Sequence, residues 1–300
     1  MAVEVVCVAS WNVDLIAQIA SPLQRGQTQL AQGFERLPGG KGSNAAIAAA
    51  RQGAQVGLIA RIGGDDFGQM GLDLWAKESI HSQFVVRGEG EVNGTALILV
   101  YADGDNSIAV YPGAGAGLSP VHVSAAQSLL SQARVVMASC EVPLAATRLA
   151  FEIAKSYGAL TLLTPAPAMP LPADLWPCID VLTPNEGELL MLAQATDVAT
   201  AARTLLSRGV GAVVVTLGER GCALYRRDEA PLHVAGHAVK VVDTIGAGDT
   251  FTGTLAAALS QSCAWPEALR WANAAAALST QARGAVTAMP SRTQVQTWLG

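Results

Sequence analysis

Short, almost continuous apolar runs recur along the chain and alternate with longer stretches rich in alanine and leucine. The runs have the length of strands and few polar positions, which is typical of strands covered on both faces of a sheet. They lie at Val3–Ala9, Val56–Ile59, Val135–Ala138, Leu160–Thr164, Val181–Thr183 and Ala212–Leu217. The helices expected between them lie at Ser43–Gln52, Met70–Lys77, Pro120–Gln132, Pro143–Tyr157, Glu186–Gln194, Ala199–Ser207, Asp249–Gln261 and Pro266–Gly284. This alternation predicts an α/β fold, a three-layer α/β/α sandwich with a largely parallel central sheet.

Two stretches, Gln18–Leu37 and Val92–Tyr111, break the alternation. Both carry strand-like residues, among them Thr28–Leu30 and Gly94–Val100, with no helix between them. We expect them to pair as a small β-sheet that stands off the main one and acts as a lid, with a functionless edge hairpin as the alternative. The predicted division is a nucleotide- and substrate-binding core of residues 1–11, 38–91 and 112–300, and a lid of residues 12–37 and 92–111.

The composition excludes several classes of protein. Hydrophobic residues make up 51% of the 300 residues and charged residues 14%, well below the roughly 25% of average domains, so a disordered chain is excluded. The mean hydropathy is +0.33, but no apolar run approaches the about 20 residues of a membrane-spanning helix. A net charge of −5 without a basic cluster argues against nucleic acid as a partner.

The cellular compartment follows from the cysteines and the first residues. Five scattered cysteines without a Cys-x-x-Cys pair favour a reducing environment over a disulfide framework or a zinc site. Residues 1–5 carry an acid and no basic region, so no secretory signal is expected there. The expected location is the cytoplasm.

The most informative motif runs from Val242 to Phe251. Gly246, Ala247 and Gly248 have almost no side chain, and their amides would lie at the N-terminus of the following helix, which is a suitable place for an anion. Asp249, in the first turn, is placed to accept a proton from a hydroxyl held beside that anion. This pairing suits phosphoryl transfer to an alcohol, whereas a glycine-rich turn that merely starts a helix is the structural alternative. Neither a Rossmann fingerprint nor a Walker A loop is present.

A second group of polar residues follows predicted strands. Gly39–Asn44 precedes an alanine-rich helix and offers a lysine and an amide beside backbone that a ligand can approach closely. Asn12 and Asp14 follow the first strand, and Glu141 follows the strand at Val135–Ala138. Such residues suit a polyhydroxylated ligand at the strand ends, although each alone is more typical of a turn.

Two further strand-to-helix junctions carry weaker indications. The acids of Thr183–Glu188 are suited to hold waters of a Mg²⁺ ion, or they form only an acidic first helical turn. Thr216–Gly221 has the glycines of a loop at the edge of a nucleotide, or is an ordinary turn. His233 and His237 lack the glutamate of a zinc-binding H-E-x-x-H motif, so no zinc site is expected.

Taken together, these motifs resemble the ribokinase family of carbohydrate kinases, the PfkB-type sugar kinases, over essentially the whole chain. Gly39–Asn44 followed by Gly63–Gly68 is similar to the N-terminal signature of the family, and Asp243–Gly253 is similar to its C-terminal signature. The resemblance implies an enzyme that transfers a phosphoryl group from ATP to a sugar hydroxymethyl group with Mg²⁺ and a monovalent cation, typically K⁺.

The resemblance also implies residue roles. Asp249 would be the catalytic base, and Gly246, Ala247 and Gly248 would form the anion hole. The implied sugar ligands are Asn12, Asp14, Gly40, Lys41, Asn44, Glu141 and Asp249. The implied nucleotide contacts are Asn185, Thr216, Gly218, Gly221, Gly248 and Asn273. The implied metal set is Glu188 for Mg²⁺ and, for the monovalent cation, Asp243, Ile245, Ser279, Ala282, Gly284 and Ala288, of which the last four act mainly through backbone carbonyls.

Within the family, the sugar set matches ribokinases proper, so the expected reaction is D-ribose plus ATP to D-ribose 5-phosphate plus ADP. The alternatives are another sugar such as fructose or 2-keto-3-deoxygluconate, a nucleoside, or a catalytically silent sugar-binding sensor. Departures from the family pattern at Trp11, Ser139, Thr164 and Tyr111–Pro112 lie near the expected sugar side and bear on the substrate rather than the reaction. A small isolated sheet needs further apolar burial, so a homodimer through the lid is expected.

Overall fold

The computed structural model describes residues 3–300, and Met1 and Ala2, the start of the segment in which no secretory signal is expected, lie outside it. Nine strands form the central sheet in the order β13-β12-β11-β10-β9-β8-β1-β4-β5. All neighbouring pairs are parallel except those of β12 with β11 and with β13. The bounds are β1 Val5–Ala9, β4 Val56–Gly63, β5 His81–Gly88, β8 Val135–Ser139, β9 Leu160–Thr164, β10 Val181–Leu182, β11 Ala212–Thr216, β12 Cys222–Arg226 and β13 Leu232–Val234. The predicted α/β/α sandwich is confirmed.

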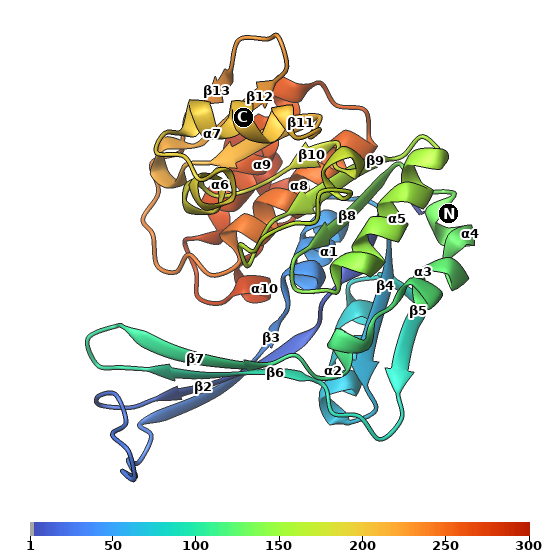
Figure 1. The fold of residues 1–300 in the computed structure, drawn as a ribbon. Coiled ribbons are helices and arrows are strands. Elements are labelled where there is room, and N and C mark those ends of the chain that lie inside the picture. The colour runs from blue at the N-terminus through green and yellow to red at the C-terminus, as the bar shows by residue number, and fades with distance from the viewer. Residues whose placement is uncertain (1–2) are drawn as a thin grey trace.

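Helices cover both faces of this sheet (Figure 1). On one face lie α1 (Lys41–Arg51), α2 (Asp66–Lys77), α8 (Ala247–Ser260), α9 (Trp265–Ser279) and α10 (Ala285–Ala288). On the other lie α3 (Pro120–Ala125), α4 (Gln127–Leu130), α5 (Leu144–Ser156), α6 (Glu186–Ala193) and α7 (Val198–Ser207), while α11 (Arg292–Leu299) packs on α9. Short 3₁₀ turns occupy Gly113–Gly117, Trp176–Cys178 and Gly218–Arg220.

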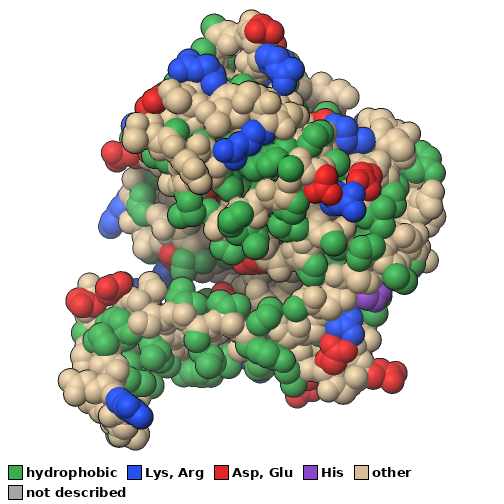
Figure 2. All heavy atoms as spheres, viewed as in Figure 1, with side chains coloured by type: hydrophobic (Ala, Val, Ile, Leu, Met, Phe, Trp, Pro, Cys, Tyr) green, Lys and Arg blue, Asp and Glu red, His purple; other side chains and the backbone are tan. Residues whose placement is uncertain are grey.

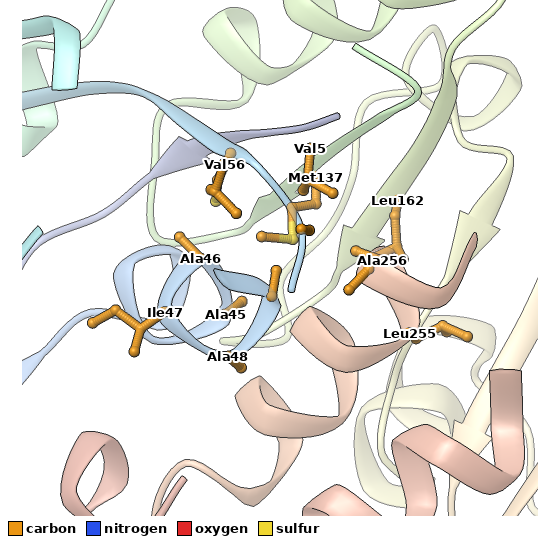
Figure 3. Packing of buried hydrophobic residues seen from close by; sticks show 14 of the residues in the cluster. Val5, Ala45, Ala46, Ile47, Ala48, Val56, Met137, Leu162, Leu255 and Ala256 are labelled. Atoms are coloured by element: carbon orange, nitrogen blue, oxygen red, sulfur yellow. The ribbon is translucent and has the colours of Figure 1, made fainter. Parts of the chain in front are cut away.

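Alternation along the buried strands divides the core into two layers. In β1, Val5, Cys7 and Ala9 face the layer beneath α1 and α8, whereas Val6 and Val8 face the layer beneath α5. Figure 3 shows the first layer, in which strand residues meet alanines of α1 and residues of α8. These small side chains let the helices approach the sheet closely.

The prediction of a long helix that ends at Gly284 is wrong, because α9 ends at Ser279. In a continuing helix the carbonyl of Thr280 would accept the amide of Gly284. That carbonyl instead accepts the amides of Val242 and Asp243, at 2.7 and 3.1 Å, and the Gly284 amide donates to Oδ2 of Asp243 at 2.8 Å. Residues 280–284 are therefore a loop pinned to the segment that precedes α8. The helix predicted at Pro120–Gln132 likewise breaks at Ala126 into α3 and α4.

A separate sheet of four strands projects from the core (Figure 1). Its order is β3-β2-β6-β7, with β2 at Asn12–Gln18, β3 at Gly33–Gly39, β6 at Gly94–Val100 and β7 at Asn106–Tyr111. The expected small sheet is thus present, although Thr28–Leu30 lies in the loop between β2 and β3 and not in a strand. We call this four-stranded sheet the lid sheet. Figure 2 shows hydrophobic side chains along it and a hollow between it and the body of the molecule.

The strand order places a ligand crevice beside β1. From β1 the chain leads to β4 on one side and later to β8 on the other, so the direction in which strands are added reverses between β1 and β8. In open α/β sheets, ligands bind at the carboxyl ends of strands at such a switch point. Ser10 and Glu141 follow these two strands at that edge.

Candidate active site

The N-termini of α1 and α8 converge at one point. The side-chain amide of Asn44, in the first turn of α1, donates a 2.9 Å hydrogen bond to Oδ2 of Asp249, in the first turn of α8. One turn further along α8, a β-carbon placed on Gly253 would lie 2.1 Å from the carbonyl oxygen of Ala45. Because only glycine fits this crossing, the two helices lie close enough for their first turns to meet.

Asp249 lies in an environment suited to a proton acceptor. Its residue is only 8% exposed, and burial raises the pKa of its carboxyl to about 6. The ammonium of Lys41 and the hydrogen bond from Asn44 oppose that increase, whereas Glu141 and Glu188 add to it. The group is therefore poised to exchange a proton close to neutral pH.

The amides beside Asp249 are partly free, as an anion hole requires. Gly246 adopts a positive φ of 75° as the N-cap of α8. Within residues 3–300, neither its amide nor that of Gly248 has a hydrogen-bond partner. The amide of Ala247 donates to the carbonyl of Thr244 at 3.2 Å. The predicted trio of free amides is thus reduced to two, because the tight turn before α8 uses the middle one.

The first turn of α1 shows the opposite arrangement. The amide of Lys41 donates to Oε2 of Glu141 at 2.8 Å, and that of Gly42 donates to Oγ of Ser10 at 3.1 Å. Ser10 in turn donates to the same Glu141 oxygen at 2.6 Å. Since the fold already satisfies these amides, α8 rather than α1 offers the anion site.

Lys41 is the charge centre of the crevice. Its pKa is raised, because attraction from Asp249, Glu141, Glu188 and Asp14 outweighs the burial that opposes it. Burial and repulsion from Glu141 raise the pKa of Asp14 to about 6, while Lys41 opposes the increase. The structure thus brings together four of the predicted sugar ligands that come from separate parts of the chain.

The remaining predicted sugar residues lie where the lid sheet joins the core. Asn12 opens β2, and a β-carbon placed on Gly94 would lie 2.1 Å from its side-chain oxygen. Gly40, at φ 94°, is the single residue between β3 and α1. One acceptor there is unused, because Oδ1 of Asn44 is buried without a partner in the described chain. A ligand hydroxyl is the natural donor to it.

The departures from the family pattern have different surroundings. Trp11 is a core residue, with its indole N–H bonded to the carbonyl of Phe67 at 2.9 Å and its ring edge-on to Trp75. Ser139 and Thr164 line a cavity of about 10 Å³ beside Asp249. Two of the departures, Ser139 and Thr164, therefore lie directly behind Asp249, whereas the Trp11 side chain lies in the core between β1 and α2.

A cleft of about 1080 Å³ opens on the other side of the α8 N-terminus. Five predicted nucleotide residues line it, namely Thr216, Gly218, Gly221, Gly248 and Asn273. Its opposite wall is the segment 236–241, which the sequence analysis did not select. The amide of Asn273 donates to the carbonyl of Ala235 at 2.7 Å, so this residue also holds the start of that wall. The sequence signal that could have identified this wall is the alternation of apolar and other residues just before the glycine motif.

Asn185 and Glu188 form a capping box at the start of α6. The Asn185 side chain accepts the amide of Glu188 at 2.8 Å, and Oε2 of Glu188 accepts the amide of Asn185 at 2.9 Å. Burial raises the pKa of Glu188. Within the described residues no cluster of three or more His, Cys, Asp or Glu side chains could hold a metal alone. A Mg²⁺ ion would therefore be held here mainly by phosphates and water, with Glu188 as the residue that would bind its waters.

The loop chosen for a monovalent cation supplies oxygen donors. Asp243 ties its two halves together, because Oδ1 accepts the amide of Ile245 at 3.0 Å and Oδ2 accepts that of Gly284. Among residues 3–300, the carbonyls of Asp243, Ile245 and Ala282 accept no hydrogen bond. Ser279 ends α9, and Ala288 ends α10. Uncharged carbonyl oxygens around one carboxylate are a donor set that fits an alkali cation.

The structure also shows the surroundings of the cysteines and of the two histidines that the sequence analysis considered. The five cysteines are all free. His233 lies edge-on to Tyr225, and His237 lies edge-on to Trp298, so the two histidines have different aromatic neighbours. No helix between residues 3 and 300 is both long and apolar enough to cross a bilayer.

Comparisons with known proteins agree with this geometry. Residues 2–292 match the family described as pfkB family carbohydrate kinase. The chain is 34% identical to a ribokinase of Haemophilus influenzae over 295 residues, which cover 97% of this chain and 96% of that one. It is 32% identical to a deoxyribokinase of Salmonella typhi, with 99% and 98% covered. The structure of Arabidopsis thaliana ribokinase complexed with ribose and ATP superposes with a TM-score of 0.95 at 32% identity, covering 100% of this chain and 99% of that one. The chain therefore belongs to the pfkB family of carbohydrate kinases.

Proposed function

We propose that the protein phosphorylates D-ribose with ATP to give D-ribose 5-phosphate and ADP. Asp249 takes the proton of the 5-hydroxyl as that oxygen attacks the γ-phosphorus. The new O–P bond forms while the bond from the γ-phosphorus to the bridging oxygen of ADP breaks. The amides of Gly246 and Gly248 hold the charge on the transferring group. The observation that carries this proposal is a buried carboxylate next to two free amides, with a large cleft on one side and polar ligands on the other.

The sugar side is assigned to residues that converge from separate strand ends. Asp14, Asn44 and Glu141 offer acceptors, while Lys41 offers donors, with Asn12 and the Gly40 backbone beside them. Such a set distinguishes sugars by the number and position of their hydroxyls, because each unmatched polar group would remain buried without a partner. The relatives named ribokinase support ribose as the acceptor.

The nucleotide side is assigned to the 1080 Å³ cleft, with Thr216, Gly218, Gly221, Gly248 and Asn273 as contacts. Asn185 and Glu188 serve the phosphate end, where bound Mg²⁺ would neutralise charge on the phosphates. Asp243 and the backbone carbonyls of the five other residues in the implied cation set would hold a monovalent cation. K⁺ is the ion to be tested. Ala247 contributes to the anion hole only by its small size.

The lid sheet is proposed to cover the sugar and to pair with a second copy in a homodimer. Leu97 of β6 and Ile108 and Val110 of β7 are 54%, 56% and 61% exposed, although they are hydrophobic strand residues. A sheet of this size rarely stands alone in water with such residues uncovered. The division into a core and a lid at residues 12–37 and 92–111, and a cytoplasmic location, belong to the same proposal.

A screen of ADP release across D-ribose, 2-deoxy-D-ribose, fructose, 2-keto-3-deoxygluconate and adenosine tests the function. Deoxyribose is included because a relative is named deoxyribokinase. The expected result is the highest kcat/KM with ribose, a dependence on Mg²⁺ and stimulation by K⁺. Sugar binding by calorimetry without ADP release from any acceptor would instead support a silent sensor.

A further inference from the structure

Arg51, the last residue of α1, makes four hydrogen bonds to two other parts of the chain. Its Nε and Nη2 donate to the two carboxylate oxygens of Glu78 at 3.0 and 2.6 Å. Its Nη1 donates to the carbonyls of Val286 and Met289 at 2.6 and 2.9 Å. Planar, two-pronged pairing of this kind fixes the guanidinium in one orientation. Arg51 therefore joins the end of α2 to the end of α10.

Helix α10 depends on contacts with the rest of the chain for its position. It has only four residues, far fewer than the roughly 12 that an isolated helix needs to be even marginally stable. At its start, the amide of Gly284 donates to Asp243. At its end, Arg51 binds the carbonyls of Val286 and Met289, which no further helical turn satisfies. These two attachments, together with the burial of Ala285, Val286 and Met289 in the core, set where α10 lies.

The start of α10 supports the anion hole directly. A β-carbon placed on Gly246 would lie 2.6 Å from Cβ and 2.9 Å from Cα of Ala285, so the two backbones are in close contact. Gly246 has a positive φ, which its neighbours must maintain. A shift of Ala285 would therefore change the direction of the Gly246 amide.

We propose that Arg51 is a positioning residue for phosphoryl transfer, acting through α10 and Ala285 on the amide of Gly246. It touches neither the cleft nor the sugar side, and it is absent from the family motifs that the sequence analysis used. This inference rests on the proposed function, because it concerns the transferring phosphoryl group. It predicts an effect on turnover with little effect on sugar binding, since the sugar ligands other than Asp249 lie on β2, after β8 and at the opposite end of α1.

The test compares Arg51→Met with Arg148→Met. Arg148 also pairs with an acid, Glu152, at 2.6 Å, but it lies on α5 on the other face of the sheet. We expect Arg51→Met to lower kcat about 10- to 100-fold with the KM for sugar within about twofold, as for a misplacement of under 1 Å or so at a reacting centre. Arg51→Lys, which keeps the charge without the fork, should recover part of kcat. Arg148→Met should leave both constants unchanged.

A double-mutant cycle tests the route. Ala285→Gly removes the β-carbon against Gly246, and its effect on kcat should not multiply with that of Arg51→Met if both act on the same amide. Should Arg51→Met fail to fold, Glu78→Gln replaces it in the cycle, because it weakens the hold on the guanidinium while keeping an acceptor. Multiplicative effects, or a lowered melting temperature with wild-type kcat, would overturn the positioning role. Absence of sugar-dependent ADP release from the wild-type protein would overturn the proposed function instead.

Discussion

Gly246 and Gly248 flank Ala247 at the N-terminus of α8, yet only Gly246 backs onto a distant part of the chain. A β-carbon on Gly246 would collide with Ala285, whereas within the described residues a β-carbon on Gly248 would meet nothing beyond its own helix within 4 Å. Gly248 instead faces the large cleft. Two glycines of one motif therefore serve different purposes.

Replacing each of these two glycines by alanine should distinguish their roles. Gly246→Ala combines a positive φ with a collision, so we expect about 2–4 kcal/mol less stability against urea. Gly248→Ala should leave stability unchanged or slightly higher, because alanine favours helices. Its methyl group would displace the phosphates, so kcat/KM for ATP should fall at least about tenfold. Equal stability losses in both variants would contradict this distinction.

Replacing Asp249 by asparagine should remove the proton acceptor without removing the other sugar ligands. We expect kcat to fall about 10³-fold, as for the loss of a general base, with sugar affinity by calorimetry within a few fold. Asp73→Asn, an identical change on the exposed face of α2, is the matched control and should keep the wild-type kcat. A near-wild-type kcat in Asp249→Asn would show that another group accepts the proton.

Activity should fall as the pH drops through about 6. Burial raises the pKa of Asp249 to about 6, and a base must be unprotonated to act. Asp14 titrates in the same range, so the acidic limb of kcat/KM against pH belongs to both carboxyls together. The profile of Asp14→Asn should keep a limb set by Asp249, and a limb centred near pH 4 in the wild type would contradict the buried environment.

The same raised pKa predicts a dependence of stability on pH. The native state holds the Asp249 proton up to about pH 6, whereas the unfolded chain releases it near the ordinary aspartate pKa of 3.8. Ionisation of the buried group therefore lowers stability as the pH rises through this interval. Asp249→Asn should be more stable than the wild type above pH 6, on the order of 1–3 kcal/mol in urea unfolding, and equal to it near pH 4. An advantage independent of pH would contradict the linkage.

A charge on the lid sheet should prevent the proposed dimer. Ile108 is 56% exposed and pairs with Ile98 of β6, so Ile108→Lys changes the surface without entering the core. We expect light scattering after gel filtration to give twice the chain mass for the wild type and a single chain for the variant. Val121→Lys, an exposed position on α3, is the control and should remain dimeric. A monomeric wild-type protein would exclude the dimer.

The sequence correctly predicted the elements of the fold that depend on local patterns of residues. Continuous apolar runs gave the buried parallel strands, and the order of elements gave the sandwich. Three strands of the central sheet were missed. The end strands β5 and β13 are partly exposed, which hides the apolar run, whereas β12 was missed although four of its five residues are buried. The end of α9 was placed five residues too late, because only the tertiary bonds of Thr280 and Gly284 terminate it.

For the site, the motifs located the groups but not their partners. No spacing rule shows that Asn44 bonds Asp249, 205 residues away. Nor does the sequence reveal that Glu141 secures the start of α1, or that Asn185 and Glu188 cap each other. The Gly-Ala-Gly motif reads as three equal amides, and only the turn geometry shows that Ala247 is already bonded. These features depend on segments that meet only in the folded chain.

Gly40 has a mechanical consequence. It alone links the last residue of β3 to the first residue of α1, and a β-carbon there would strike the Ser10 backbone at 2.7 Å. The lid sheet is thus connected through a single residue to the helix that begins with Lys41. If the sheet moves as the proposed lid, Gly40 is the one residue between β3 and α1 that can absorb the motion, so access to the crevice and the position of Lys41 are coupled. Redesign of the sheet for a different sugar would have to retune both at once.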